Sequence, residues 1–392
     1  MTSWLEDQLR DALTADAEQV RPENLRPAEQ AARTKTIVPR RRFALAVPLA
    51  AALVVVLIGT VAAMVAGTGG TTPTGPATQT LGGPRFLLIA GNDGVTVHDA
   101  RTGKVASRLG LPPTPEGSFR EPGGYLLAGA GDGATFYIAQ SVMSRETQVS
   151  STRFYRARVD EQGKPAELVR DVIPKVIGTT ASSLALTSDG TRLAYSLDGK
   201  VCGQGKMLRF CPGAQLTVVD LPAGTRRTWT TDAAGQIRNL SWAADRRVLG
   251  FVVKSEARVL DAAAAGTTLA ISRVVARGQE AKASAISPDG RSMLIGRTHL
   301  SDGRQPHRYT IDEYSVTDGR KIRTLLSVDR HGKTSAWWNL IRYDATGRHL
   351  LVVGNFYPLS RLDDGRVTPL LYQGPSDPQL SNSSPPAIEA AW

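Results

Sequence analysis

Residues that could carry out chemistry are few and scattered along this chain. Its five histidines (His98, His299, His307, His331 and His349) do not have the spacing of a metal-binding set, and no Gly-x-Ser-x-Gly nucleophile motif occurs. The adjacent pairs Asp312-Glu313 and Asp363-Asp364 have the chemistry of a general acid and base. The second pair lies in a predicted hairpin turn, where aspartate is common because it bonds the backbone. These patterns predict no cofactor or metal site and leave enzyme activity uncertain, with a non-enzyme favoured.

The elements that must position such residues are organised by an uncharged apolar stretch, residues 43–67, which predicts a transmembrane helix. A helix of this length rises roughly 37 Å, more than a hydrocarbon core of about 30 Å. Arg40, Arg41 and Arg42 precede it and residues 68–83 carry no charge, which predicts a cytoplasmic N-terminus and an outer C-terminal part in the cell membrane. A cleaved signal peptide is the alternative, but its apolar region and leading segment are usually shorter.

Residues 1–42 are predicted to be a cytoplasmic tail that contains a short amphipathic helix. Leu5, Leu9 and Leu13 fall on one face at helical spacing, with polar residues mostly elsewhere. This face is a candidate docking surface for a cytosolic partner. The sequence slightly favours a helix that frays or lies on the membrane.

Both cysteines, Cys202 and Cys211, fall in the predicted outer part. An oxidising compartment would join them across a short loop between two predicted strands, a disulfide that contributes about 2 to 3 kcal/mol. Two free thiols are the alternative. The spacing is too long for a redox Cys-x-x-Cys motif, and no histidine is close enough to indicate zinc.

Residues 68–84 have the Gly, Thr and Pro composition of a flexible linker, and residues 85–392 have the pattern of an all-β domain. In that domain, short apolar runs alternate with turn signals. Aspartate-containing turns recur before five of the predicted strands, at intervals of about the length of a propeller blade. The aspartates of these repeat turns are Asp132, Asp189, Asp245, Asp289 and Asp344.

Glycine-containing hairpin turns alternate strictly with these aspartate turns, so each unit holds about four strands, as a β-propeller blade does. Residues 387–392 resemble the inner strand that the first blade lacks. Adding that strand to residues 85–89 would close the ring and remove its open edges. The sequence therefore predicts a six-bladed propeller, or a seven-bladed one if residues 141–153 contain additional strands.

The Ser-Pro-Asp-Gly-Arg turn at residues 287–291 and its relatives resemble the repeats of TolB-type, WD-repeat-like propellers of bacterial envelopes. The resemblance covers the outer domain and implies a propeller fold. The α/β domain of TolB is missing, so a role in an outer-membrane import complex is not implied. The layout is also similar to membrane-anchored propeller proteins of GC-rich bacteria, some of which resemble anti-sigma regulators, but the tail lacks a zinc-binding set of His and Cys.

Charge and aromatic residues indicate what the outer domain contacts. Nearly all of the net charge of +11 falls outside, which favours anionic envelope polymers, although a solubilising surface of mixed sign is the simpler interpretation. The predicted compartment disfavours nucleic acid. Trp337 and Trp338 would point in opposite directions on a strand, so one is expected between blades and the other is a candidate aromatic platform, with both buried as the alternative.

Three functions follow from this reading. The leading one is a non-enzymatic, membrane-anchored binding or scaffold protein whose propeller binds a protein, a peptide or an envelope polymer. The second is a transmembrane regulator in which the propeller is the sensor and the tail is the effector. The third is a hydrolase or lyase with its site at the mouth of the propeller channel.

Overall fold

The computed structural model describes most of the chain from Pro84 onward. The described residues are 84–91, 94–198, 201–202, 209–210, 213–231, 235–278, 283–301, 305–329, 338–354, 359–370 and 389–392. Within these ranges, the side chains of residues 121–123, 201–202, 209–210, 300–301 and 305–307 are not described. The predicted tail, span and most of the linker (residues 1–83) lie outside the description.

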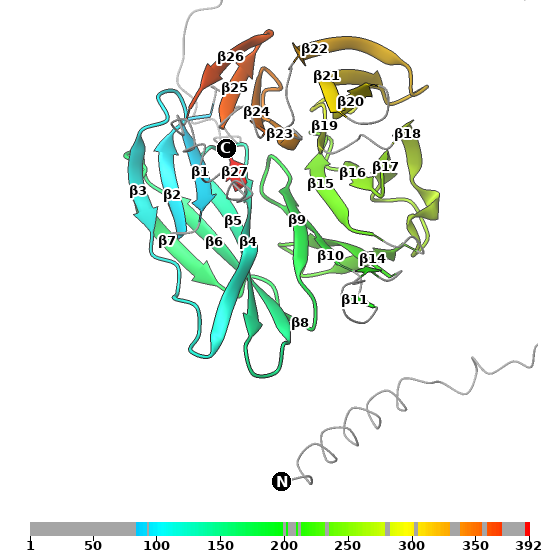
Figure 1. Ribbon diagram of the computed structural model, residues 1–392. Helices are drawn as coiled ribbons and strands as arrows, with labels where there is room; N and C mark the ends of the chain where they lie inside the picture. The colour runs from blue at the N-terminus through cyan, green and yellow to red at the C-terminus, as the bar shows by residue number, and fades with distance from the viewer. Residues whose placement is uncertain are drawn as a thin grey trace, which may run out of the picture. The chain divides into compact units, whose positions relative to one another are not determined.

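Six antiparallel sheets of the described strands are arranged in a ring, with the first strand of each sheet nearest the centre (Figure 1). Blade 1 contains β27 (Glu389–Ala391), β1 (Phe86–Gly91), β2 (Gly94–Asp99) and β3 (Val105–Leu109). Blade 2 contains β4 (Ser118–Gly129), β5 (Thr135–Ser144), β6 (Ser150–Val159), β7 (Pro165–Arg170) and the short β8 (Val176–Ile177), which pairs with β6. Blade 3 contains β9 (Ala181–Leu186), β10 (Arg192–Leu197), β13 (Gln215–Asp220) and β14 (Arg226–Thr230).

The remaining three blades repeat this order. Blade 4 contains β15 (Ile237–Trp242), β16 (Val248–Val253), β17 (Glu256–Asp261) and β18 (Arg273–Arg277), with the 3-10 helix η3 (Leu269–Ile271) before β18. Blade 5 contains β19 (Ala283–Ile286), β20 (Ser292–Ser301), β21 (Gln305–Ser315) and β22 (Lys321–Asp329). Blade 6 contains β23 (Trp338–Tyr343), β24 (His349–Gly354), β25 (Ser360–Asp363) and β26 (Arg366–Pro369). A small separate hairpin, β11 (Val201–Cys202) with β12 (Arg209–Phe210), lies in sequence between β10 and β13.

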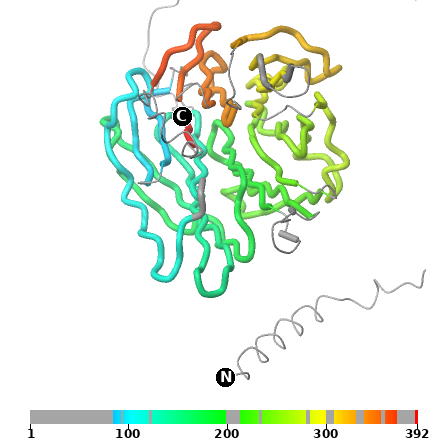
Figure 2. The backbone as a smooth tube through the Cα atoms, viewed as in Figure 1, coloured from blue at the N-terminus to red at the C-terminus, as the bar shows by residue number. Residues whose placement is uncertain are grey.

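The last strand closes the ring, as the sequence predicted. Strand β27 pairs with β1 in the register Leu88↔Ala391, Ile89↔Ala390 and Ala90↔Glu389. Figure 2 shows the chain running once around the ring, so that its red end meets its blue beginning. This pairing gives β1 a hydrogen-bonded neighbour on each side and removes an edge that would otherwise be free to pair with another chain.

The core is divided into buried apolar clusters that lie between adjacent blades. Alternate residues of a strand point to opposite faces of its sheet, so one strand serves two clusters. In β1, Leu88 packs toward blade 2, whereas Leu87 and Ile89 pack toward blade 6 together with Trp392. Among the described residues, every blade-to-blade interface has such a cluster. The ring is therefore held by its interfaces, including the one that β27 closes.

These observations confirm the all-β, six-bladed propeller. The seven-blade alternative fails because residues 141–153 continue β5 and β6 into one long hairpin of blade 2. No helix within the described ranges has the length and apolar character needed to cross a membrane. The stretch at residues 43–67 is outside those ranges, so its assignment as a span stays a prediction.

Candidate functional site

A cavity of about 110 Å³ lies at the end of the channel where the inner strands finish. All six blades contribute to its wall, through the last residues of β4, β9, β15, β19 and β23 or the turns after them, and through Trp392 after β27. Sites for small molecules usually have volumes of about 300–1,000 Å³. This cavity is therefore sized for a small ligand or for one projecting group of a larger partner.

The aspartate turns form the rim around this end of the channel. Asp132 shows their common geometry, because its Oδ1 accepts the backbone N–H groups of Ala134 and Thr135 at 2.9 and 2.8 Å. Asp245 accepts the amides two and three residues ahead of it at 2.8 and 3.0 Å. A carboxylate engaged in this way holds its turn, which is a structural task rather than a catalytic one. The aspartates that accept hydrogen bonds in these turns are Asp132, Asp189, Asp245, Asp289 and Asp344.

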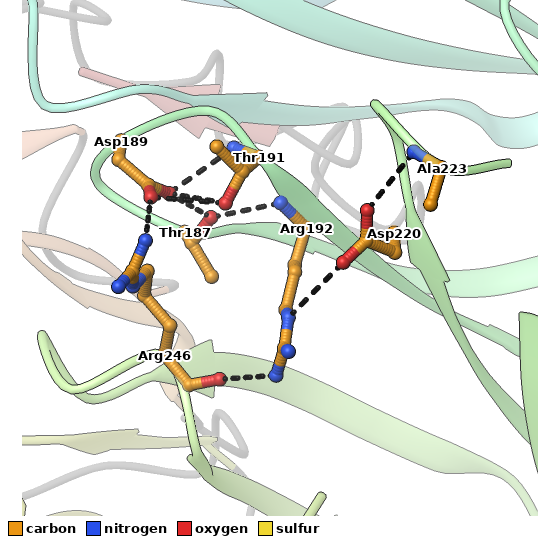
Figure 3. A network of polar contacts seen from close by, with 7 residues as sticks. All are labelled: Thr187, Asp189, Thr191, Arg192, Asp220, Ala223 and Arg246. Carbon is orange, nitrogen blue, oxygen red and sulfur yellow. Dashed lines mark hydrogen bonds and ion pairs between the residues drawn. The ribbon is translucent and has the colours of Figure 1, made fainter. Parts of the chain in front are cut away.

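Asp189 also ties its blade to the next one (Figure 3). It accepts hydrogen bonds from the Thr187 hydroxyl at 2.7 Å and from the Thr191 amide at 3.1 Å. Arg246, in the turn of blade 4, donates from Nη1 to Asp189 Oδ2 at 2.6 Å. Burial raises the pKa of Asp189, but the hydrogen bonds from both threonines and from Arg246 outweigh that effect and lower the pKa to about 2. The carboxylate is therefore a firmly ionised link between blades 3 and 4.

Arg192 extends this link across the outer part of the rim (Figure 3). Its Nη1 donates to the backbone carbonyl of Arg246 at 3.1 Å, and its Nε lies 3.8 Å from Asp220 Oδ2. Asp220 in turn accepts the backbone N–H of Ala223 at 3.1 Å. The inner aspartate turn and the outer hairpin turn of blade 3 are thus connected through charged side chains.

Backbone contacts between turns fix the shape of the mouth. The Gly131 amide donates to the Ser188 carbonyl at 2.7 Å, and the Ala244 amide donates to the Pro288 carbonyl at 2.7 Å. A Cβ atom at Gly131 would lie only 2.9 Å from the Cβ of Ala345, so the turns of blades 2 and 6 meet there at van der Waals distance. Because the turns of neighbouring blades, and those of blades 2 and 6 on either side of blade 1, contact one another directly, the ring itself fixes the shape of the cavity.

Arg342 brings a positive charge to the cavity wall from β23. Its Nη1 donates to the backbone carbonyls of Leu127 at 2.6 Å and Ala390 at 2.9 Å. Arg342 therefore joins blades 6, 2 and 1 across the channel. Burial lowers the pKa of this guanidinium, and the charge of Glu389 acts in the opposite direction.

Glu389 lies at the start of β27 and is partly buried. Burial raises its pKa to about 7, and the positive charge of Arg342 limits the rise. A carboxyl group with this pKa exists in both protonation states at neutral pH. Arg342 and Glu389 thus form an electrostatically coupled pair whose acid changes its charge near pH 7.

Aromatic side chains complete the cavity wall. Trp242, Tyr343 and Trp392 line it together with small residues of the turns. Trp338 packs between blades, as the sequence predicts for one of the two adjacent tryptophans: it is 3% exposed and lies against Gly296, whose added Cβ would meet it at 2.8 Å. Trp337 lies outside the described residues. The aromatic platform therefore stays a prediction.

The predicted acidic pairs do not act as pairs in the structure. Asp312 is 1% exposed and accepts from Thr324 Oγ1 at 2.7 Å and Lys321 Nζ at 2.8 Å. Glu313 instead bonds Arg323 Nε at 2.7 Å. Because neighbouring residues of β21 point to opposite faces, the two carboxylates have separate partners.

The second acidic pair is also divided between structural contacts. Asp363 accepts from Arg361 Nε at 2.7 Å and contacts His349 Nδ1 at 2.6 Å, while Asp364 has a φ of 45° in the turn between β25 and β26. No group of three or more His, Cys, Asp or Glu side chains suited to a metal occurs in the part of the chain that the structure describes.

Several other predicted residues have no described side chain. Cys202 belongs to β11, but its side chain is not described, and Cys211 lies outside the description, so the disulfide remains a prediction. Leu5, Leu9 and Leu13, the candidate docking face of the tail, also lie outside it.

Sequence reasoning missed Arg342, Trp242 and Trp392, which line the cavity, and Glu389, whose charge acts on Arg342. The repeat carried a usable signal, because Trp242 and Arg342 stand three and two residues before the aspartates of their turns. Positions two and three residues before a turn aspartate lie at the end of an inner strand and therefore at the mouth of the channel. Applying this rule to every blade would have identified the positions that line the cavity.

Comparison with known proteins does not assign this chain to a family. No protein-family model and no curated protein sequence matches it. Among solved structures, it is similar to a chain from a structural and mechanistic study of two prolyl endopeptidases, at 15% identity over 59% of this chain and 33% of that chain, with a TM-score of 0.34. The match thus spans about a third of that endopeptidase. The chain is also similar to an apocarotenoid oxygenase mutant from Synechocystis, at 14% identity over 73% of this chain and 68% of that one, with a TM-score of 0.40.

Proposed function

We propose that this protein is a membrane-anchored, non-enzymatic binding protein whose propeller holds a protein, peptide or envelope polymer at the mouth where the inner strands end. The observation that carries the proposal is the cavity to which all six blades contribute. Its rim is fixed by backbone contacts between turns, and tryptophan, tyrosine, arginine and small residues line its wall. Concave sites with this mixture of apolar surface and few polar groups are typical binding sites.

The membrane anchor and its topology rest on the sequence. Residues 43–67 are long and apolar enough to span a bilayer, and the arginines before them favour a cytoplasmic N-terminus. The likeness to TolB-type propellers likewise rests on the turn motif alone. Deleting residues 43–67 is expected to move the protein from the membrane fraction to the soluble fraction after alkaline extraction. Retention of the deleted protein in the membrane would contradict the anchor.

Blocking the mouth tests the binding proposal directly. Ala244 is exposed and lines the cavity, so Ala244→Trp adds an indole at the mouth without removing a buried contact. Ala223→Trp is the matched control, because Ala223 is exposed in the outer hairpin turn of blade 3 and does not line the cavity. Crosslinked partners of the full chain are captured from membranes with each variant and identified by mass spectrometry.

The proposal expects partners that the wild type and Ala223→Trp retain but that Ala244→Trp loses. An unchanged set of partners in Ala244→Trp would refute binding at the mouth. A third sample that lacks residues 2–38 separates the regulator alternative. Loss of a cytosolic partner only in that sample would make the tail the binding element and the propeller its sensor.

A further inference from the structure

The guanidinium of Arg342 has unused hydrogen-bonding capacity beside the cavity. A guanidinium carries five N–H groups, and both hydrogen bonds that the structure shows leave from Nη1. Among the described residues, Nε and Nη2 have no hydrogen-bond partner, and neither is a fully buried atom. The Nε and Nη2 groups together form one edge of the planar guanidinium, and a carboxylate can accept two parallel hydrogen bonds from such an edge.

The charge of Arg342 is also poorly balanced at the cavity. The two groups that accept its hydrogen bonds are neutral carbonyls. Asp344 has the other charged side chain among the described residues that line the cavity, and its Oδ1 accepts the amides of Arg348 and His349 while its Oδ2 accepts the Thr346 hydroxyl. A buried charge without a contacting counter-charge is unfavourable, so an incoming anion would stabilise this arrangement.

We infer that the cavity, which Trp242 also lines, binds a carboxylate group held by the Nε and Nη2 edge of Arg342. The inference rests on the proposed function and names the chemistry that the mouth recognises. Two sources carry a carboxylate on a body small enough to enter: a free short-chain acid, and the C-terminal residue of a peptide. Apolar residues that line the cavity, Trp242 among them, offer contact area for the carbon atoms next to that carboxylate.

Glu389 makes this binding depend on pH. Below pH about 7 the Glu389 carboxyl is mostly protonated, so Arg342 presents its full charge to a ligand. Above that pH the Glu389 carboxylate repels a second anion bound to Arg342. Burial raises the pKa of Tyr343, which therefore stays neutral in this range, and the turn engages Asp344. Carboxylate binding should accordingly take up protons near pH 7 and weaken as the pH rises.

Calorimetric titration of the full chain in non-ionic detergent tests the inference. The probes are sodium propionate, the peptide N-acetyl-Ala-Ala with a free carboxylate, and the same peptide with a terminal amide. The inference expects the acid peptide or propionate to bind at pH 6, with the amide at least about tenfold weaker because it lacks the charge. Tighter binding of the acid peptide identifies a peptide terminus, and equal or tighter binding of propionate identifies a free acid. Failure of both acids at millimolar concentration, or equal binding of the amide, would overturn the inference.

Two variants separate ligand binding from the structural role of Arg342. Arg342→Gln keeps a donor for the carbonyls but removes the charge, and it should abolish binding of the acid. Because that variant could also disturb the ring, Glu389→Gln provides an independent test in the opposite direction. It should bind the acid about fivefold or more tightly than the wild type at pH 8. It should also lose the proton uptake that titrations in two buffers of different ionisation enthalpy measure at pH 7. A purely structural Arg342 predicts no change in Glu389→Gln, and that result would refute the inference.

The outcome also distinguishes this inference from the proposed function. If no probe binds but Ala244→Trp still loses its captured partner, the carboxylate inference fails and binding at the mouth stands. If the probes bind and Ala244→Trp keeps every partner, the cavity recognises a small acid and the proposed capture of a macromolecule at the mouth fails.

Discussion

The carboxylate of Asp189 should stabilise the propeller in a way that depends on pH. Its pKa falls from the ordinary value of 3.8 to about 2 in the folded chain. Such a difference corresponds to about 2.4 kcal/mol when converted without screening. The Asp189 side chain is 33% exposed and that of its partner Arg246 is 54% exposed, so solvent screening reduces this figure. We expect Asp189→Asn to lower the free energy of unfolding by about 1 kcal/mol at pH 7.

The sign of the pH dependence follows from the direction of the shift. Because folding lowers the pKa, the contribution is fully present above the unfolded value of about 4 and disappears as the pH falls through about 2. About half of it should be gone at pH 3. Urea denaturation of the wild type and of Asp189→Asn should therefore show a smaller difference in the free energy of unfolding at pH 3 than at pH 7.

A neighbouring turn supplies the control for this prediction. Asp245 also accepts two backbone amides, at 2.8 and 3.0 Å, but the described residues provide no arginine from the next blade to contact it. Asp245→Asn should consequently cost less than Asp189→Asn, and removing Arg246 should erase most of the difference between them. A penalty for Asp189→Asn that is equal at pH 7 and pH 3, or no larger than that for Asp245→Asn, would refute the reasoning.

Three further predictions concern packing and the surface. Gly296→Ala places a methyl group 2.8 Å from Trp338 and should cost about 1–3 kcal/mol, whereas Gly91→Ala meets no atom within 4 Å and should change the free energy of unfolding by less than about 0.5 kcal/mol. Trp392→Ala leaves a cavity between blades 6 and 1 and should lower the free energy of unfolding by about 3–5 kcal/mol. An unchanged thermal midpoint of unfolding would argue against closure of the ring by β27. Asp329→Asn breaks the ion pair with Arg308, in which the Arg308 and Asp329 side chains are 57% and 61% exposed. It should lower the free energy of unfolding by less than about 0.5 kcal/mol, and 1 M salt should abolish the difference between the variant and the wild type.

The blade count could be predicted because turn chemistry repeats in sequence. Each inner turn needs a carboxylate that accepts amides ahead of it, so Asp132 and its equivalents mark one position per blade. The closing strand was recognisable because residues 387–392 match the segment before Asp245. Such turns can be recognised in a single sequence because the residues that form each turn are neighbours along the chain.

The cavity could not be predicted in the same way because its residues are distant in sequence. Arg342 bonds Leu127, which is 215 residues away, and Ala390, which is 48 residues away. The pKa of Glu389 likewise depends on burial that exists only after β27 has closed the ring. The acidic pair Asp312-Glu313 shows the converse, since adjacency along a strand places side chains on opposite faces and gives the two carboxylates separate partners.

Hydrogen exchange of the full chain, measured by mass spectrometry with and without its captured partner, tests binding at the mouth most directly. The account predicts slower exchange in the segments that end the inner strands, residues 128–131, 185–188, 240–244 and 342–345. The outer strands β3, β14 and β22 should exchange at unchanged rates. Protection confined to those outer strands, with the mouth segments unaffected, would contradict the account.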